Sequence, residues 1–227
     1  MELQAVLFDL DGVVTDTAKY HFTAWRNLAR RIGIDIDGDF NESLKGIERM
    51  QSLERILVHG GREQDYSQEE KERLAQEKNE EYVSLLAGLT PEDTYPGIKE
   101  LLLELRERRI PAVIASASKN APLILEALRL NEHFHAIVDP GGIPGKPAPD
   151  IFLQGAKLAG ADPAHCIGIE DSQAGIEAIK AAGMHAVGIG EAGIPAPSGA
   201  DLVCSSTKEL TLRLLLDSAG MACKRQG

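Results

Sequence analysis

Beyond residue 97 the sequence alternates between short β-prone runs and helical runs, and this alternation constrains the fold more than any other feature. Four strand-like runs lie near residues 112–115, 136–138, 166–169 and 186–189, with helical spacing of apolar residues between them. Strands that alternate with helices form a parallel sheet covered by helices on both faces. We therefore predict an α/β fold with a Rossmann-like, doubly wound parallel sheet, in which ligands bind at the carboxyl ends of the strands. The expected helices are 97–109, 121–130, 150–159, 172–182 and 207–217, with a short strand near Leu202.

The first strand is separated from this pattern by a stretch that contains only helical signals. The run Ala5–Phe8 is uncharged and β-prone, so it needs the sheet to bury it. Residues 17–88 carry apolar residues at helical spacing, and Ser67 with Glu70 forms a capping box. We predict that residues 1–16 and 89–220 form the α/β core and that 17–88 form an inserted all-helical bundle, or cap. Residues 221–227 show no periodicity, and we expect a disordered tail there.

Composition excludes several classes of function. The 227 residues carry a formal net charge of −11, and the basic residues are dispersed, so no nucleic-acid partner is expected. No apolar run approaches membrane-spanning length, and Glu2 stands where a secretory signal carries positive charge. The three cysteines form no CxxC pair, which argues against a zinc site or a disulfide framework. We expect a cytoplasmic protein without a membrane partner, and nothing in the sequence requires more than a monomer.

Two aspartates follow the first strand, and they are the first candidate for chemistry. Asp9 and Asp11 share one side of the strand because side chains alternate between faces. Carboxylates held this close repel each other unless a cation lies between them or one keeps a proton. A solvated acidic turn is the alternative for this motif alone. An EF-hand calcium loop is excluded, because Val13 and Val14 stand where that loop needs an oxygen ligand and a glycine.

Polar residues recur at the ends of the other predicted strands. The segment 116–120 follows one strand, Lys146-Pro147 follows another, and Glu170-Asp171 ends a third. Each alone could be a solvated strand end, but their coincidence with the two aspartates argues for one site. Several carboxylates in one cleft require a hard divalent cation, and oxygen ligands suit Mg²⁺. Ser116 and Lys146 provide a hydroxyl and an ammonium group for phosphate oxygens, so the predicted chemistry is phosphoryl transfer.

The order and spacing of these motifs resemble the haloacid dehalogenase superfamily of phosphotransferases. The resemblance lies in Asp9-x-Asp11-Gly12-x-x-x-Asp16, the strand-end Ser116, Lys146-Pro147 and Glu170-Asp171, with a helical cap inserted after the first motif. It implies that Asp9 is a nucleophile that forms an aspartyl phosphate and that Asp11 is the general acid and base, with Lys146 also in the catalytic set. It implies one Mg²⁺ per chain, held by Asp9, the main-chain carbonyl of Asp11, Glu170 and Asp171.

Within that superfamily, the cap segments resemble the β-phosphoglucomutase family. This resemblance adds Thr17 and His21 to the catalytic residues and implies that His21 and Lys78 link cap closure to Asp11. It also implies that Arg49, together with Ser118 and Asn120, binds the phosphate that is not being transferred. The alternatives are solvated Arg49 and Lys78, a surface His21, and Trp25 as part of the cap core. The expected substrate-binding residues are Trp25, Lys45, Gly46, Ile47, Arg49, Lys78, Ser116, Ala117, Ser118, Lys119 and Asn120.

The resemblance implies interconversion of β-D-glucose 1-phosphate and glucose 6-phosphate through the aspartyl phosphate, with β-glucose 1,6-bisphosphate as phosphoryl primer. A mutase must keep water from the aspartyl phosphate until sugar is bound, and a closing cap provides that gate. Three alternatives stay open: a sugar phosphate phosphatase of the same fold, a non-enzymatic phosphate sensor, and a dehalogenase. The last is weak because dehalogenation lacks the magnesium requirement that Glu170-Asp171 implies.

Overall fold

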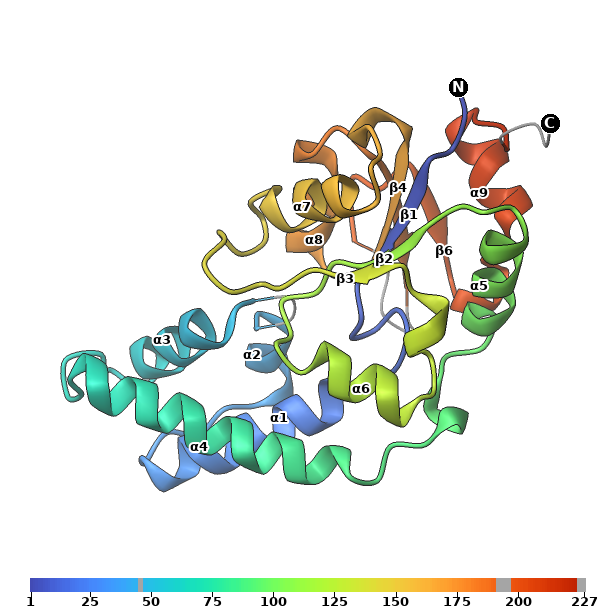
Figure 1. Ribbon diagram of the computed structural model, residues 1–227. Coiled ribbons are helices and arrows are strands. Elements are labelled where there is room, and N and C mark those ends of the chain that lie inside the picture. The colour runs from blue at the N-terminus through green and yellow to red at the C-terminus, as the bar shows by residue number, and fades with distance from the viewer. Residues whose placement is uncertain (45–46, 191–196, 224–227) are drawn as a thin grey trace. The chain divides into compact units, whose positions relative to one another are not determined.

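The structure, a computed structural model, describes residues 1–44, 47–190 and 197–223. Two compact units make up the chain: residues 1–16 with 90–227, and residues 17–89. The division lies one residue beyond the end of the insertion expected from the sequence. Figure 1 shows the course of the chain through both units, which are described separately below.

The first unit is built on a parallel sheet, and the predicted doubly wound α/β fold is confirmed. Within the described residues the sheet has six strands in the order β3-β2-β1-β4-β5-β6. All neighbouring strands run parallel. The strands are β1 (Ala5–Phe8), β2 (Ala112–Ile114), β3 (Ala136–Ile137), β4 (Cys166–Glu170), β5 (His185–Ile189) and β6 (Leu202–Cys204).

Helices cover both faces of this sheet (Figure 1). Helices α7 and α8 pack on one face, while α5 and α9 lie together on the other. The long predicted helix over 207–217 is wrong, because the chain extends at Leu210 and Thr211 and Thr211 caps a separate helix. The helices of this unit are α5 (Ile98–Glu107), α6 (Ala121–Ala127), α7 (Asp150–Leu158), α8 (Gln173–Ala181) and α9 (Leu212–Ala219), with short 3-10 turns at Pro91–Asp93, Asn131–His133, Pro163–His165 and Thr207–Glu209.

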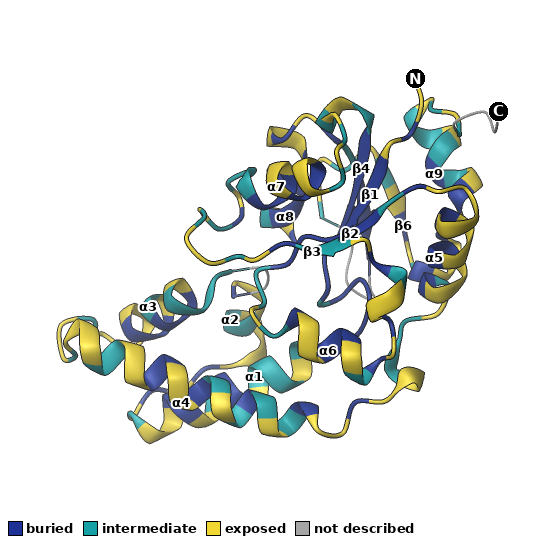
Figure 2. Ribbon diagram, in the orientation of Figure 1, coloured by how far each residue is buried: buried dark blue, intermediate teal, exposed yellow. Residues whose placement is uncertain are grey.

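The core of the first unit lies between the sheet and helices α7 and α8. Leu7 and Val113 point from the strands toward Phe152 of α7 and Ile179 of α8, and all four are fully buried. Figure 2 shows this division, with the central strands β1, β2 and β4 buried and the outer sides of the helices exposed. Since β1 is buried along its whole length, its carboxyl end is held rigidly and the residues that follow it start from a fixed point.

Within the segment 221–227, Ala222 is part of a backbone pairing between the two ends of the chain. Ala222 pairs with the beginning of the chain, since its carbonyl accepts from the Leu3 amide and its amide donates to the Met1 carbonyl. The prediction of disorder from residue 221 is therefore wrong for Ala222, whose backbone groups are satisfied by that pairing. Residues 224–227 lie outside the described part of the chain.

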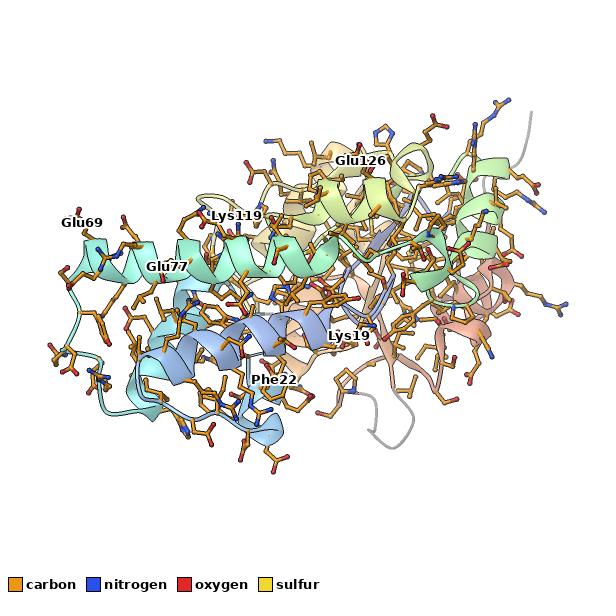
Figure 3. All side chains as sticks on the ribbon, turned by 90° about the horizontal axis from the view of Figure 1, so that it is seen from below. Lys19, Phe22, Glu69, Glu77, Lys119 and Glu126 are labelled. Carbon is orange, nitrogen blue, oxygen red and sulfur yellow. The ribbon has the colours of Figure 1, made fainter. Side chains whose placement is uncertain are left out.

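The second unit, residues 17–89, contains helices joined by turns and has no strand among its described residues. Helices α1 and α4 run side by side (Figure 3). Arg31 on α1 forms an ion pair with Glu77 on α4. The apolar core comprises residues such as Leu28, Leu53 and Leu57. The capping box of Ser67 and Glu70 opens α4 as the sequence indicated. The helices are α1 (Ala18–Arg31), α2 (Gly38–Glu42), α3 (Arg49–His59) and α4 (Gln68–Leu86).

Strand β4 and helix α8 approach each other too closely for any side chain at Gly168. A Cβ added there would lie 2.6 Å from the Ile179 side chain, which is fully buried. We expect Gly168→Ala to lower the free energy of unfolding by about 1–3 kcal/mol through overpacking. Chemical denaturation measures the loss, with Gly38→Ala as the control, because nothing lies within 4 Å of a Cβ at Gly38. Equal stability of the two variants would contradict this packing.

Candidate active site

The two aspartates of the first motif occupy a tight turn at the carboxyl end of β1. The turn is closed by hydrogen bonds from the Val14 amide to the Leu10 carbonyl and from the Gly12 amide to the Thr15 carbonyl, both 2.9 Å. Gly12 has φ +85°, and a Cβ there would collide with the carboxylate of Asp171. A glycine is thus required for two reasons, its backbone conformation and the close approach of the acidic loop.

Asp9 and Glu170 are brought together by the strand register. Phe8 is the register partner of Ile169, and the Asp9 amide donates to the Ile169 carbonyl at 2.9 Å. The next residue of each strand end, Asp9 and Glu170, therefore lies at the same level of the sheet. Strands β1 and β4 are neighbours in the sheet, and their carboxyl ends therefore lie together, as the sequence analysis predicted.

Lys146 bridges the two buried carboxylates. Its Nζ donates to Asp9 Oδ1 and to Glu170 Oε2, both at 2.6 Å, and its side chain is fully buried. Burial opposes the charge on Lys146, but the two carboxylates outweigh it and raise the pKa of the ammonium. Burial and the charge of Glu170 raise the pKa of Asp9 to about 6, although Lys146 acts in the opposite direction. Asp9 therefore depends on cations to be fully ionised at neutral pH.

Glu170 is fixed by a residue that the sequence analysis missed. The hydroxyl and amide of Ser172 donate to Glu170 Oε1, at 2.6 and 3.1 Å, while Lys146 occupies the other oxygen. Ser172 also caps helix α8, accepting from the Gly175 amide, and a Cβ at Gly175 would collide with Glu170. A serine at the N-cap just after Glu170-Asp171 was the available signal, since capping residues lie within reach of the strand end.

The carboxylates of Asp9, Glu170 and Asp171 can hold a metal ion. Each offers one oxygen, and these oxygens lie within 4.8 Å of one another. The clearance at Gly12 lets Asp171 approach the turn of Asp9 and Asp11. A set of oxygen donors fits Mg²⁺, and such an ion would offset the excess negative charge around Asp9. These observations support the predicted ligands Asp9, Glu170 and Asp171; the role of Asp11 stays a prediction.

The segment 116–120 lies after β2 and forms a series of short side-chain turns. Ser116 is buried, and its Oγ accepts from the Ser118 amide, while Ser118 Oγ accepts from the Asn120 amide, both at 3.3 Å. Ala117, Ser118 and Asn120 are half-buried, and Lys119 is exposed, ahead of the helix that carries Glu126 (Figure 3). The loop thus carries two hydroxyl groups, an ammonium group and a side-chain amide, which are groups that can donate hydrogen bonds to an anion.

The predicted cap residues gather at one end of α1 and α4. Lys78 is buried, its Nζ lies 2.7 Å from His21 Nδ1, and its charge stands 4.6 Å from the centre of the Trp25 ring. Burial, then the charges of Lys78 and Arg49, lowers the pKa of His21 well below its ordinary value. Lys78 is thus an interior residue and His21 is half-buried, so the alternative of a solvated helix face is wrong for Lys78.

Arg49 and Trp25 occupy different environments within the helical unit. Arg49 Nη2 donates to Asn79 Oδ1 at 2.8 Å and is half-buried at the start of α3. Trp25 is 3% exposed and packs in the apolar core of the unit, so packing alone explains its position. Ile47, another predicted substrate-binding residue, is held by a hydrogen bond from its amide to the Leu44 carbonyl. Lys45 and Gly46, also predicted to bind substrate, lie outside the described residues.

The ion pairs of Lys146 are buried, whereas the Lys180–Asp201 pair of the same length is exposed, so removal of the lysine should destabilise the protein more in the first case. Lys146→Met leaves two buried carboxylates without their cation, and the free energy of unfolding should fall by about 3–5 kcal/mol. Lys180→Met is the matched control, because Lys180 lies 2.6 Å from Asp201 but both are substantially exposed, so its loss should stay below about 1 kcal/mol. Denaturation with and without Mg²⁺ measures both, and Mg²⁺ should reduce the loss in Lys146→Met. Equal losses would contradict the account.

Within the described residues, no helix combines the length and the apolar character required to cross a membrane.

Comparison with known proteins places the chain in a family. A model of the haloacid dehalogenase-like hydrolase family matches residues 3–183. A β-phosphoglucomutase from Bacillus subtilis is 53% identical over 94% of each chain. A fructose-1-phosphate phosphatase from Escherichia coli is 32% identical over 81% of this chain and 95% of its own. The crystal structure of a β-phosphoglucomutase from Clostridium difficile superimposes with a TM-score of 0.93 at 47% identity, covering 96% of this chain and 97% of that one. The chain therefore belongs to the haloacid dehalogenase-like family and, within it, to the β-phosphoglucomutases.

Proposed function

We propose that the protein interconverts β-D-glucose 1-phosphate and glucose 6-phosphate, with Asp9 as the group that carries the phosphoryl between them. The observation that favours a mutase is Arg49, a cation that the helical unit provides in addition to the site around Asp9. Its guanidinium is held by the neutral amide of Asn79, which orients it without cancelling its charge. Transfer to a second phosphate-bearing sugar requires such a cation, whereas hydrolysis requires only water at Asp9.

Asp9 attacks phosphorus of β-glucose 1,6-bisphosphate, a bond from its carboxylate oxygen to phosphorus forms, and the bond from phosphorus to the sugar oxygen breaks. Lys146 holds Asp9 in place and compensates its charge, and Ser172 keeps Glu170 oriented toward Lys146. Ser116 provides a hydroxyl for the phosphoryl oxygens. Mg²⁺ held by Asp9, Asp11, Glu170 and Asp171 would neutralise charge on the transferred phosphoryl group.

Asp11 moves the proton in both half-reactions. When the aspartyl phosphate passes its phosphoryl to O6 of β-glucose 1-phosphate, Asp11 accepts the proton of that hydroxyl. When Asp9 then attacks the other phosphate of the bisphosphate, the protonated Asp11 returns the proton to the departing sugar oxygen. The bisphosphate is thus both primer and intermediate, and it must turn around between the two steps so that its phosphates exchange places. In each step, Arg49, Ser118 and Asn120 hold the phosphate that is not being transferred.

The cellular setting belongs to the same proposal. Phosphorylated sugars are charged and stay in the compartment where they are made, so we place the enzyme in the cytoplasm. The proposed mechanism requires no residue from a second copy of the chain, so a monomer is sufficient for it. A sugar phosphate is the one partner that this mechanism needs.

One assay distinguishes the mutase from a phosphatase and from a binding protein. The enzyme is given β-glucose 1-phosphate, Mg²⁺ and a trace of β-glucose 1,6-bisphosphate, and glucose 6-phosphate and free phosphate are measured together. We expect glucose 6-phosphate to form well in excess of phosphate, with no turnover of the α-anomer. Phosphate release without glucose 6-phosphate would instead establish a phosphatase, and no magnesium-dependent turnover at all would leave only binding.

Replacement of Asp11 tests the shared acid and base. Asp11→Asn cannot accept or return a proton, so kcat should fall by about 10²–10⁴-fold. Because the same group serves both half-reactions, the rates of phosphoryl transfer to and from Asp9 should fall together in single-turnover experiments. Asp35→Asn is the control, since Asp35 has a side chain that is 81% exposed. Full turnover of Asp11→Asn, or loss of one half-reaction alone, would exclude this role.

A further inference from the structure

Tyr82 is a residue of helix α4 that contacts three of the predicted cap residues. It is fully buried, and its ring stacks on the His21 imidazole with 3.9 Å between ring centres and 29° between planes. Its hydroxyl donates to Thr17 Oγ1 at 3.0 Å, and Lys78 Nζ stands 4.7 Å from its ring centre. The sequence analysis assigns Tyr82 no role beyond its place in the helical insertion 17–88, yet the structure places it among the polar groups of this unit.

The contact between Lys78 and His21 determines which nitrogen of the imidazole carries the proton. An ammonium group has only donors, so His21 Nδ1 at 2.7 Å must accept from Lys78. The neutral imidazole then carries its proton on Nε2 and presents that nitrogen as a donor. Burial and the nearby cations lower the pKa of His21, which agrees with a neutral ring. The faces of Trp25 and Tyr82 stabilise the buried ammonium.

Tyr82 also sets the role of Thr17. Thr17 is the N-cap residue of α1, but its side chain makes no capping bond, although threonine commonly does so. Its Oγ1 instead accepts the proton of the Tyr82 hydroxyl. Because that bond uses an acceptor position of Thr17, the Thr17 hydroxyl keeps its own proton for donation. One tyrosine therefore orients both groups as donors.

We propose that Tyr82 is a positioning residue with two tasks. Its ring holds the His21 imidazole and the Lys78 ammonium in the geometry that gives the Nε2–H tautomer, and its hydroxyl sets the direction of the Thr17 hydroxyl. This inference rests on the proposed function only for its effect on turnover. A leucine could fill a comparable volume in the interior of the helical unit. It could neither stack on imidazole, nor face an ammonium favourably, nor donate to Thr17.

The tautomer is tested by NMR correlation of the histidine ring nitrogens in ¹⁵N-labelled protein. The His21 signals are identified by their loss in His21→Asn. In the wild type and in Tyr82→Phe, which retains the ring, we expect the Nε2–H tautomer with no titration between about pH 6 and pH 8. In Tyr82→Leu the ring loses its stacking partner, and we expect mixed tautomers and a titration within that range. An unchanged His21 signal in Tyr82→Leu would overturn the proposal.

Turnover provides the second readout. Tyr82→Phe loses one hydrogen bond, so kcat should fall about 3–10-fold while KM changes less than about twofold. Tyr66→Phe, which removes a tyrosine hydroxyl elsewhere in the same unit, should stay within about twofold of wild type. Equal kcat in the two variants would overturn the role of the hydroxyl, and this comparison stands even if Tyr82→Leu does not fold. A wild type without mutase activity would refute the proposed function, whereas the NMR result would still decide the tautomer.

Discussion

The structure depends on one buried cation, the Lys146 ammonium between Asp9 and Glu170. Two carboxylates at the ends of adjacent strands repel each other in an interior that excludes water, and without compensation one of them would be protonated. Lys146 permits their close approach, and Ser172 holds the second oxygen of Glu170. The sheet order, the glycines at positions 12 and 175 and the cap of α8 all serve this arrangement.

In the helical unit, a buried cation is stabilised by neutral groups. Its buried cation, Lys78, lies against the imidazole of His21 and the faces of two aromatic rings. Arg49, by contrast, is half-buried and held by an amide. Under the proposed function these two cations have separate tasks: Lys78 organises neutral donor groups, while Arg49 receives a phosphate.

Much of this was predictable from the sequence because strand ends and motif spacing are local signals. Asp9, Lys146 and Glu170 could be assigned to one site because parallel strands end at one edge of a sheet. The break at Leu210 and Thr211 was not predictable, since helical spacing of apolar residues continues across it. Tyr82 was also missed, because a tyrosine in a helix resembles core packing until its neighbours across the helix pair are known.

The central claim is that the phosphoryl group resides on Asp9 during turnover. The direct measurement is to quench the reaction with β-glucose 1-phosphate and bisphosphate within one turnover and reduce the trapped acyl phosphate with tritiated borohydride, which converts a phosphorylated aspartate to homoserine. Peptide mapping should then find tritium at residue 9, appearing before glucose 6-phosphate accumulates. Steady formation of glucose 6-phosphate with no label at residue 9 would contradict the account.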